Sequence, residues 1–324
     1  MNGRSVVLFA VFSILILLML VAWTSQAQTS LNLKNDSKKS AIVWMGLEIT
    51  GENISADLSA IREHKDDLTG VSFEHYMIDS QGDLEPIFPL TNVTSAIQSD
   101  GLQTFPMIIS VNLNDIEYLI NHPNHFIQAA VSQAVAERFT GFNVDFEPTK
   151  AANSTVAMEY CRFLTDFADA LHSEGKILTV DVATWNQFWN FSALGNTTTD
   201  ILYDMGTYAS PSIDFASALE YAAMEIPLSK LGIGLITVNV NNGSILANYS
   251  VSARFQFLES YNVTNVAVWD MPLNSYWWVY LSNFLGEKNN HIINKNLVII
   301  IITILVAAGV SFLFIFKRKR NRIS

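Results

Sequence analysis

The sequence of 324 residues predicts an α/β fold, a (β/α)₈ TIM barrel, on the strength of three observations. Short apolar runs rich in branched residues alternate with amphipathic segments, which is typical of strands alternating with helices. The chain contains eight such runs. The alternation fills roughly 245 residues, the usual size of this barrel. A doubly wound open sheet is the alternative, but it more often has fewer strands at this length.

The first 27 residues are interpreted as a targeting segment. Ser5 to Trp23 are almost wholly apolar and follow one basic residue, Arg4. The small-x-small stretch Ser25-Gln26-Ala27 suits signal-peptide cleavage. A retained N-terminal anchor is the alternative, because the apolar run is long for a signal peptide.

The other end predicts a membrane span. Leu297 to Phe316 carry no charge over twenty residues, enough for a helix to cross a bilayer. Five Lys or Arg follow in the tail 317–324, which places that tail in the cytoplasm. We therefore expect a single-pass membrane protein whose partner is the lipid bilayer and whose main domain is extracellular or lumenal.

Composition supports an exterior location and excludes some partners. All thirty Asp and Glu lie between the two end segments, so this part is acidic and nucleic acid is not an expected partner. Cys161 is the only cysteine, so an intrachain disulfide is impossible. N-linked glycans are expected at nine Asn-x-Ser/Thr sites: Asn35, Asn53, Asn92, Asn153, Asn190, Asn196, Asn242, Asn248 and Asn262.

The elements lie in one domain, 41–285, between polar linkers at 28–40 and 286–296. The clearest helical pattern is Thr155 to Glu174, and further helices are expected at about 126–138 and 274–285. The predicted strands are 41–49, 69–78, 104–112, 139–147, 176–185, 200–208, 231–237 and 263–270.

The fourth strand carries two acids inside an apolar run, GFNVDFEP. Alternate strand residues share a face, so Asn143, Asp145 and Glu147 point one way and the aromatic residues point the other. The polar set is expected to face the barrel interior, with Glu147 at the strand's C-terminal end, where barrel enzymes place catalytic groups. An ionised Asp145 is expected to raise the pKa of Glu147 and keep it protonated as a general acid. The alternative is an acid pair with only a structural role.

This strand resembles the signature D-G-x-D-x-D-x-E of glycoside hydrolase family 18, the chitinase and chitobiase family. Gly141, Asp145 and Glu147 match, whereas Thr140 and Asn143 replace two acids. Asn143 is still expected to hydrogen-bond Asp145.

The resemblance continues in order along about residues 41–285. The run MIISVN at 107–112 is similar to the family's third strand, and its Ser110 matches the serine of the family's S-x-G-G pattern. Trp269 stands where the family has the eighth-strand tryptophan beneath the sugar. The family's sixth strand carries M-x-Y-D, but here Met205 and Tyr208 are one residue too far apart. Either a bulge brings Tyr208 into the site, or Tyr203-Asp204 is the true match.

The resemblance implies hydrolysis of β-1,4-linked N-acetylglucosamine glycans by substrate-assisted, retaining catalysis. Glu147 is then the general acid and base, Asp145 orients the acetamido group, and Tyr208 hydrogen-bonds its oxygen. Substrate contacts are expected from the side chains Asn143, Trp269, Met205 and Asp181, although a structural hydrogen bond is an equal alternative for Asp181.

Neither the motif nor the resemblance implies a metal or another cofactor. The alternative function is a weakly catalytic or non-catalytic glycan-binding protein on the same barrel. Only about Val238 to Gly243 separate the seventh strand from the next helix, so the inserted domain of many processive chitinases is not expected.

Overall fold

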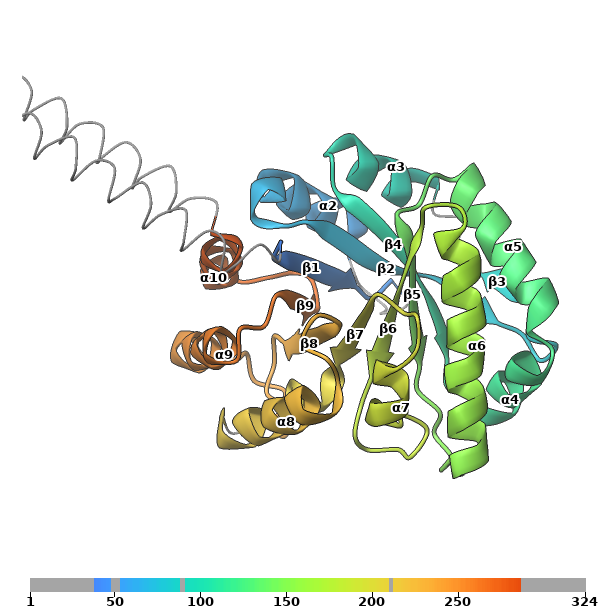
Figure 1. The fold of residues 1–324 in the computed structure, drawn as a ribbon. Coiled ribbons are helices and arrows are strands. Elements are labelled where there is room, and N and C mark those ends of the chain that lie inside the picture. The colour runs from blue at the N-terminus through green and yellow to red at the C-terminus, as the bar shows by residue number, and fades with distance from the viewer. Residues whose placement is uncertain (1–37, 48–52, 88–90, 210–211, 287–324) are drawn as a thin grey trace, which may run out of the picture. The chain divides into compact units, whose positions relative to one another are not determined.

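The computed structural model describes residues 38–47, 53–87, 91–209 and 212–286, which form a closed barrel of strands surrounded by helices (Figure 1). Eight strands follow one another in parallel around the barrel, and the last, β9, pairs with the first, β1. The predicted (β/α)₈ barrel is therefore confirmed. Its strands are β1 (Ser40–Met45), β2 (Gly70–Ile78), β4 (Gln103–Ser110), β5 (Gly141–Phe146), β6 (Ile177–Val182), β7 (Ile201–Asp204), β8 (Leu231–Ile236) and β9 (Asn265–Trp269).

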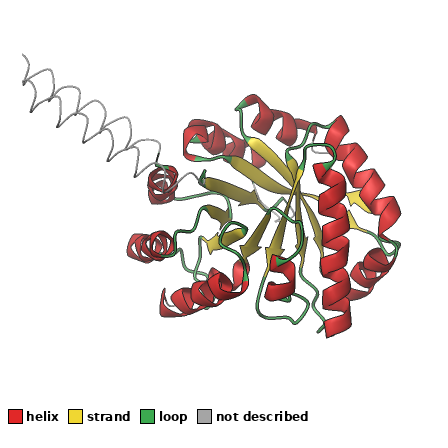
Figure 2. Cartoon of the chain, in the orientation of Figure 1, coloured by secondary structure: helices red, strands yellow, loops and turns green. Residues whose placement is uncertain are grey.

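Helices cover the outside of the barrel, as Figure 2 shows in red. The α-helices are α2 (Ile54–Glu63), α3 (Thr91–Ser99), α4 (Leu113–Asn121), α5 (Pro123–Ala136), α6 (Ser154–His172), α7 (Phe191–Gly195), α8 (Ser212–Glu225), α9 (Asn248–Ser260) and α10 (Ser275–Leu285). Two 3₁₀ turns, η1 (Lys65–Asp67) and η2 (Met205–Tyr208), complete the set in the described residues.

Two local features differ from the sequence-based expectation. The predicted strand 200–208 ends at Asp204, and Met205 to Tyr208 form η2 instead. A short strand, β3 (Leu84–Pro86), was not predicted and pairs antiparallel with β2, outside the barrel circuit. The other strands agree with the predicted ranges to within a few residues, as is usual for element ends.

The two faces of β5 have the predicted orientations. Phe142 and Phe146 face outward, where their rings pack 6.1 Å from Phe167 and Tyr160 of α6, measured between ring centroids. All four rings are fully buried. Burial of such aromatic side chains is among the largest single contributions to a core. The apolar face of α6 and the outward face of β5 therefore pack against each other. Because Asp145 lies on the opposite face of β5, it points into the barrel.

Several asparagines of the predicted glycosylation sites have a structural role. The side chains of Asn53, Asn153 and Asn190 accept hydrogen bonds from backbone N–H groups at the start of α2, α6 and α7. Asparagine is a preferred N-cap residue because its oxygen satisfies a free N–H group of the first turn. Helix capping accounts for these asparagines, and N-glycosylation stays a prediction.

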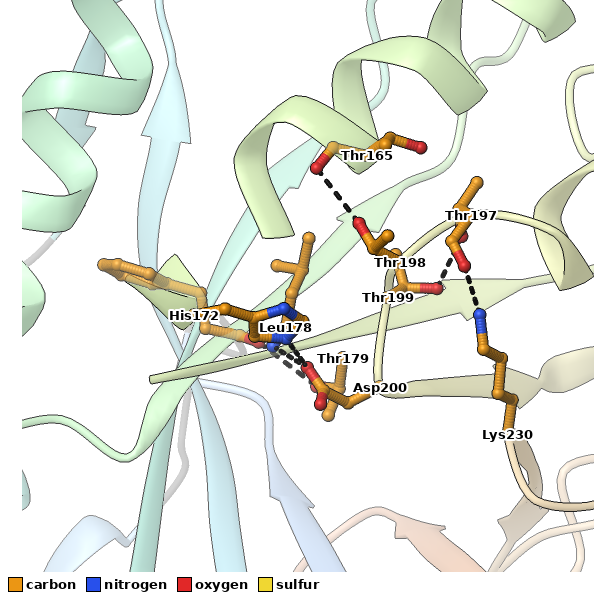
Figure 3. Close-up of polar contacts among 10 residues, drawn as sticks. Thr165, His172, Leu178, Thr179, Thr197, Thr198, Thr199, Asp200 and Lys230 are labelled. Atoms are coloured by element: carbon orange, nitrogen blue, oxygen red, sulfur yellow. Dashed lines mark hydrogen bonds and ion pairs between the residues drawn. The ribbon is translucent and has the colours of Figure 1, made fainter. Parts of the chain in front are cut away.

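Polar contacts join neighbouring segments at the end of the barrel where the strands begin (Figure 3). Asp200, just before β7, accepts a 2.8 Å hydrogen bond from the Leu178 N–H, and its carboxylate lies 2.9 Å from Nε2 of His172. Lys230, just before β8, donates to the carbonyl of Thr197. Such contacts at the N-terminal face of a barrel serve stability.

No helix within the described residues is long and apolar enough to cross a bilayer. The segments 1–27 and 297–316, which carry the predictions of a signal or anchor and of a transmembrane helix, lie outside the described residues.

Candidate active site

A cavity of about 160 Å³ lies at the C-terminal ends of the barrel strands. The predicted site residues Glu147, Asp145, Asp181, Met205, Tyr208 and Trp269 all line it, and Asn143 does not. Its full lining is Trp44, Met107, Asp145, Glu147, Asp181, Met205, Tyr208 and Trp269. The barrel therefore brings together residues that are up to 225 positions apart in the sequence, from Trp44 to Trp269.

The strands β4 and β5 position the two acids. Asp145 lies on β5, opposite Ile109 of β4, and Glu147 directly follows the strand. The backbone N–H of Glu147 donates a 2.8 Å hydrogen bond to the carbonyl of Ser110 at the end of β4. This bond continues the ladder by one residue and fixes the backbone from which the Glu147 side chain projects.

The two acids form a hydrogen-bonded pair in which burial raises both pKa values. Asp145 and Glu147 are hydrogen-bonded to each other, so one of them must be protonated. Burial raises the pKa of Asp145 well above its ordinary value, and the nearby carboxyl groups of Asp181, Glu147 and Glu74 raise it further. The pair therefore shares one proton between Asp145 and Glu147.

Glu147 itself is partly buried, and burial raises its pKa, whereas the hydrogen bond from Asp145 lowers it. The pKa of Glu147 is raised in the predicted direction, but the source differs from the expected charge of Asp145. Desolvation is the cause of the raised pKa. A carboxyl group with a raised pKa remains suited to donate a proton.

Asn143 bonds to the neighbouring strand and not to Asp145 as expected. Its side chain is fully buried, and its Nδ2 donates to Oδ2 of Asp181 over 2.6 Å. Its Oδ1 accepts a 2.6 Å hydrogen bond from the hydroxyl of Thr179. The register of β5 and β6 pairs Asn143 with Thr179, which places both inward partners within reach. Its predicted contact with substrate stays a prediction.

Asp181 combines the two roles that the sequence left open. It lines the cavity, and it accepts the hydrogen bond from Asn143. Burial raises the pKa of Asp181 well above its ordinary value, and the bond from Asn143 opposes this rise. Asp181 in turn raises the pKa of Asp145. Asn143 therefore acts on the acid pair through Asp181.

The 3₁₀ turn η2 resolves the spacing problem of Met205 and Tyr208. Residues three apart lie on the same side of a 3₁₀ turn, so both side chains reach the cavity. Asp204 caps this turn by accepting a 2.8 Å hydrogen bond from the Gly206 N–H. Tyr203 and Asp204, the alternative match, do not line the cavity.

The phenol of Tyr208 stays neutral over the physiological pH range. Burial raises its pKa well above the ordinary value, and the surrounding carboxyl groups raise it further. Tyr208 is therefore available as a hydrogen-bond donor. Tyr203 lies against Trp44, with their ring centroids 5.6 Å apart, so it supports the wall of the cavity from below.

Trp44 and Met107 were missed by the sequence analysis. Trp44 lies near the end of β1, and Met107 lies on β4 opposite Asn143. Both strands read as continuous apolar runs, so alternation could not separate inward from outward residues. Trp269 ends β9 and lines the cavity as predicted. The site is thus a small cavity with an acid pair, a neutral phenol and two tryptophans.

No group of three or more His, Cys, Asp or Glu within the described ranges is arranged to hold a metal ion. The chemistry that the cavity offers is proton transfer from a carboxyl group, together with hydrogen bonds from carboxyl and phenol groups. Its apolar walls suit the weakly polar face of a sugar ring.

Solved structures with the same fold include chitinases and spore cortex-lytic enzymes. The spore cortex-lytic enzyme SleL of Bacillus megaterium is 16% identical with a TM-score of 0.64, over 76% of this chain and 74% of that chain. A chitinase of Chromobacterium violaceum is 16% identical with a TM-score of 0.65, over 76% of this chain and 99% of that chain.

The GH18 chitinase ChiB of Flavobacterium johnsoniae is 14% identical with a TM-score of 0.58, over 77% of this chain and 94% of that chain. No protein-family model and no curated protein sequence matches the chain. The chain therefore has the chitinase-like barrel fold of glycoside hydrolase family 18.

Proposed function

We propose that the protein is a glycoside hydrolase that cleaves β-1,4-linked N-acetylglucosamine glycans, with Glu147 as general acid and base. The observation that carries the proposal is the hydrogen-bonded pair Asp145–Glu147 in a cavity that also contains Tyr208 and Trp269. The cavity lies where barrel enzymes of every chemistry place their active sites. The likeness in fold to chitinases is consistent with this chemistry.

The proposed reaction has two steps. The hydrogen-bonded pair carries one proton, which Glu147 gives to the glycosidic oxygen, leaving Asp145 ionised, while the acetamido carbonyl of the substrate attacks the anomeric carbon and the bond to the leaving sugar breaks. The resulting oxazolinium ion carries a positive charge. Water then attacks the anomeric carbon and gives a proton to Glu147, which restores both the enzyme and the acetamido group with retained configuration.

Asp145 and Tyr208 stabilise the acetamido group in this proposal. The positive charge that develops beside Asp145 favours its ionised form, opposing the burial and the acidic neighbours that raise its pKa in the resting site. The neutral phenol of Tyr208 donates to the acetamido oxygen. Both interactions strengthen as charge develops, which is the condition for lowering the barrier.

The dimensions of the site favour short or exposed glycan ends. Its volume of about 160 Å³ lies below the range of roughly 300–1,000 Å³ that is usual for small-molecule pockets. Residues 237–247 alone connect β8 to α9, so no inserted domain deepens the cleft at this point. We infer that the cavity holds about one sugar residue, with the rest of the glycan outside it.

Thr140, one of the two departures from the family motif, lies far from the acid pair. Thr140 precedes β5, and its hydroxyl accepts a 3.0 Å hydrogen bond from the Thr104 N–H at the start of β4. Glu147 lies seven residues further along, about 23 Å at the rise of an extended strand. Thr140 therefore ties two strands together far from the acid pair. This position is an argument against the alternative of a binding protein that lost catalysis through Thr140.

A second candidate substrate is a peptidoglycan that contains N-acetylglucosamine. The observation that favours it is the likeness in fold to two spore cortex-lytic enzymes. Both candidates use the same acid and the same acetamido group. They are separated by comparing turnover of chitin oligosaccharides with that of purified peptidoglycan.

The test is release of a fluorophore from an N,N′-diacetylchitobioside by the full chain between pH 3 and 9. We expect release by the native protein and slower release by Glu147→Gln, because the fluorophore is an aryl leaving group that needs little help from an acid. The matched control is Glu174→Gln, because Glu174 is exposed and follows α6 outside the cavity. Absence of release by the native protein on several N-acetylglucosaminides would contradict the proposal.

We also propose that the protein is a single-pass membrane glycoprotein with its barrel extracellular or lumenal and its C-terminus cytoplasmic. The support is the apolar segment 297–316, the basic tail and the nine glycosylation sites. Protease treatment of sealed vesicles tests the orientation. Digestion of the tail from the lumenal side would contradict it.

A further inference from the structure

A second, larger cavity lies on the flank of the barrel. It has a volume of about 610 Å³ and is formed by the segment after β6 together with α7 and α8. This flank groove shares no residue with the cavity around Glu147. It is lined by Thr184, Trp185, Asn186, Gln187, Trp189, Phe191, Ser217, Ala218 and Tyr221.

Exposed aromatic rings form much of the flank groove. Trp185 is 55% exposed and Tyr221 is 44% exposed, although both rings have buried aromatic neighbours. Trp185 meets Trp189 edge to face at 5.6 Å, and Tyr221 lies 5.7 Å from Phe191, measured between ring centroids. These contacts hold the two exposed rings in place. Fixed aromatic surfaces that remain open to solvent mark binding sites.

The polar groups of the flank groove select a neutral ligand. No charged residue is among those that line it. Thr184 and Gln187 are exposed there and offer a hydroxyl and an amide. The indole N–H of Trp189 is buried and has no hydrogen-bond partner within the described residues. A neutral ligand with apolar faces and many hydroxyl groups, such as a saccharide, matches this set.

The flank groove is coupled to the segment that follows Glu147. Nδ2 of Asn186 donates hydrogen bonds to the carbonyls of Pro148 and Lys150, both over 2.9 Å. Oδ1 of the same side chain accepts from the Phe188 N–H over 3.0 Å. Asn186 thus joins the wall of the groove to the loop that begins directly after the acid pair. A glycan held in the groove therefore lies next to the catalytic face of the barrel.

We propose that the flank groove is a second saccharide site, in which Trp185 and Tyr221 stack against neutral N-acetylglucosamine units. The choice of sugar rests on the proposed function, because an anchored glycan chain is the one that the cavity around Glu147 acts on. The site binds and performs no chemistry. It explains how an enzyme with a cavity of only about 160 Å³ retains a longer glycan.

The experiment measures binding of triacetylchitotriose to the full chain by titration calorimetry, in the Glu147→Gln background. We expect two sites per chain. Adding Trp185→Ala or Tyr221→Ala removes one site or weakens it at least tenfold, and Trp185→Phe retains it because a ring remains. Adding Trp269→Ala removes the other site. Tyr249→Ala is the matched control, since Tyr249 is an exposed ring, 81% accessible, outside the groove.

The outcomes separate this proposal from the proposed function. Binding that is unaffected by Trp185→Ala and by Tyr221→Ala overturns the flank groove as a saccharide site, whatever the enzyme hydrolyses. Loss or at least tenfold weakening of one binding site in these two variants supports it, even where fluorophore release by the native chain is absent. A loss caused equally by Tyr249→Ala overturns the assignment to this groove.

Discussion

Replacement of Asn143 by alanine tests how the inside of the barrel is held together. The variant removes the 2.6 Å hydrogen bonds to Asp181 and from Thr179, and all three residues are almost completely buried. A buried polar group that loses its partner costs about 1–3 kcal/mol. Asp181 loses its donor, whereas the Thr179 hydroxyl keeps the Phe142 carbonyl as acceptor at 3.3 Å, so the free energy of unfolding is expected to fall by about 1–3 kcal/mol. The midpoint of thermal unfolding falls by roughly 2–4 °C for each kcal/mol.

Urea-induced unfolding of the native chain and the variant, followed by tryptophan fluorescence, measures this difference. The matched control is Asn114→Ala, because Asn114 is exposed on α4. We expect the control to change the free energy of unfolding by less than about 0.5 kcal/mol. A loss below about 1 kcal/mol for Asn143→Ala would refute the reasoning, since the two buried bonds would then contribute little.

Two further predictions concern Asp204 and Gly141. Burial raises the pKa of Asp204 from 3.8 to about 7, so its contribution to stability is fully present below pH 3.8 and is lost as pH rises through about 7. Asp204→Asn keeps the acceptor for Gly206 and removes the ionisation. Urea unfolding is therefore measured at pH 4 and pH 8. Between these two pH values the free energy of unfolding of the native chain should fall by on the order of 4 kcal/mol more than that of the variant. Equal decreases would contradict the assignment. Gly141→Ala places a Cβ 1.9 Å from the carbonyl oxygen of Ile177, which forces β5 away from β6. We expect destabilisation of more than about 3 kcal/mol, and a variant with native stability in the same unfolding assay would refute the close approach.

The sequence predicted the barrel and the direction of the acid pair because both depend on periodicity. Phe142 and Phe146 alternate with Asn143 and Asp145, and a strand can bury the first pair under a helix only by turning the second pair inward. The position of Glu147 after the strand follows from the same count. These features are local, so one sequence is sufficient to predict them.

Other features depend on neighbours that periodicity does not specify. The partner of Asn143 is set by the register of β5 against β6, which pairs it with Thr179. The raised pKa of Asp145 depends on its burial and on the carboxyl groups that converge on it from separate strands. The Tyr208 side chain reaches the cavity because Met205–Tyr208 form a 3₁₀ turn, which the apolar pattern of the sequence does not predict. Each of these is a tertiary effect that overrides the local pattern.

The flank groove illustrates the same limit on the scale of the surface. Trp185 and Trp189 are only four residues apart in the sequence, but Tyr221 reaches them only through the packing of α7 and α8. The predicted strand 176–185 includes Trp185, whereas β6 ends at Val182. The residues from Thr184 to Trp189 therefore lie outside the strand, and most of them line the groove.

The central claim, that Glu147 is the general acid, is tested most directly by comparing leaving groups. The quantity is the ratio of kcat/KM between the native chain and Glu147→Gln, measured on an aryl chitobioside and on a chitin oligosaccharide. An aryl leaving group departs with little help from an acid, whereas a sugar requires protonation. We predict a loss of about 10²–10⁴ for the oligosaccharide and a clearly smaller loss for the aryl substrate. Equal losses on both substrates, or no loss, would contradict the assignment.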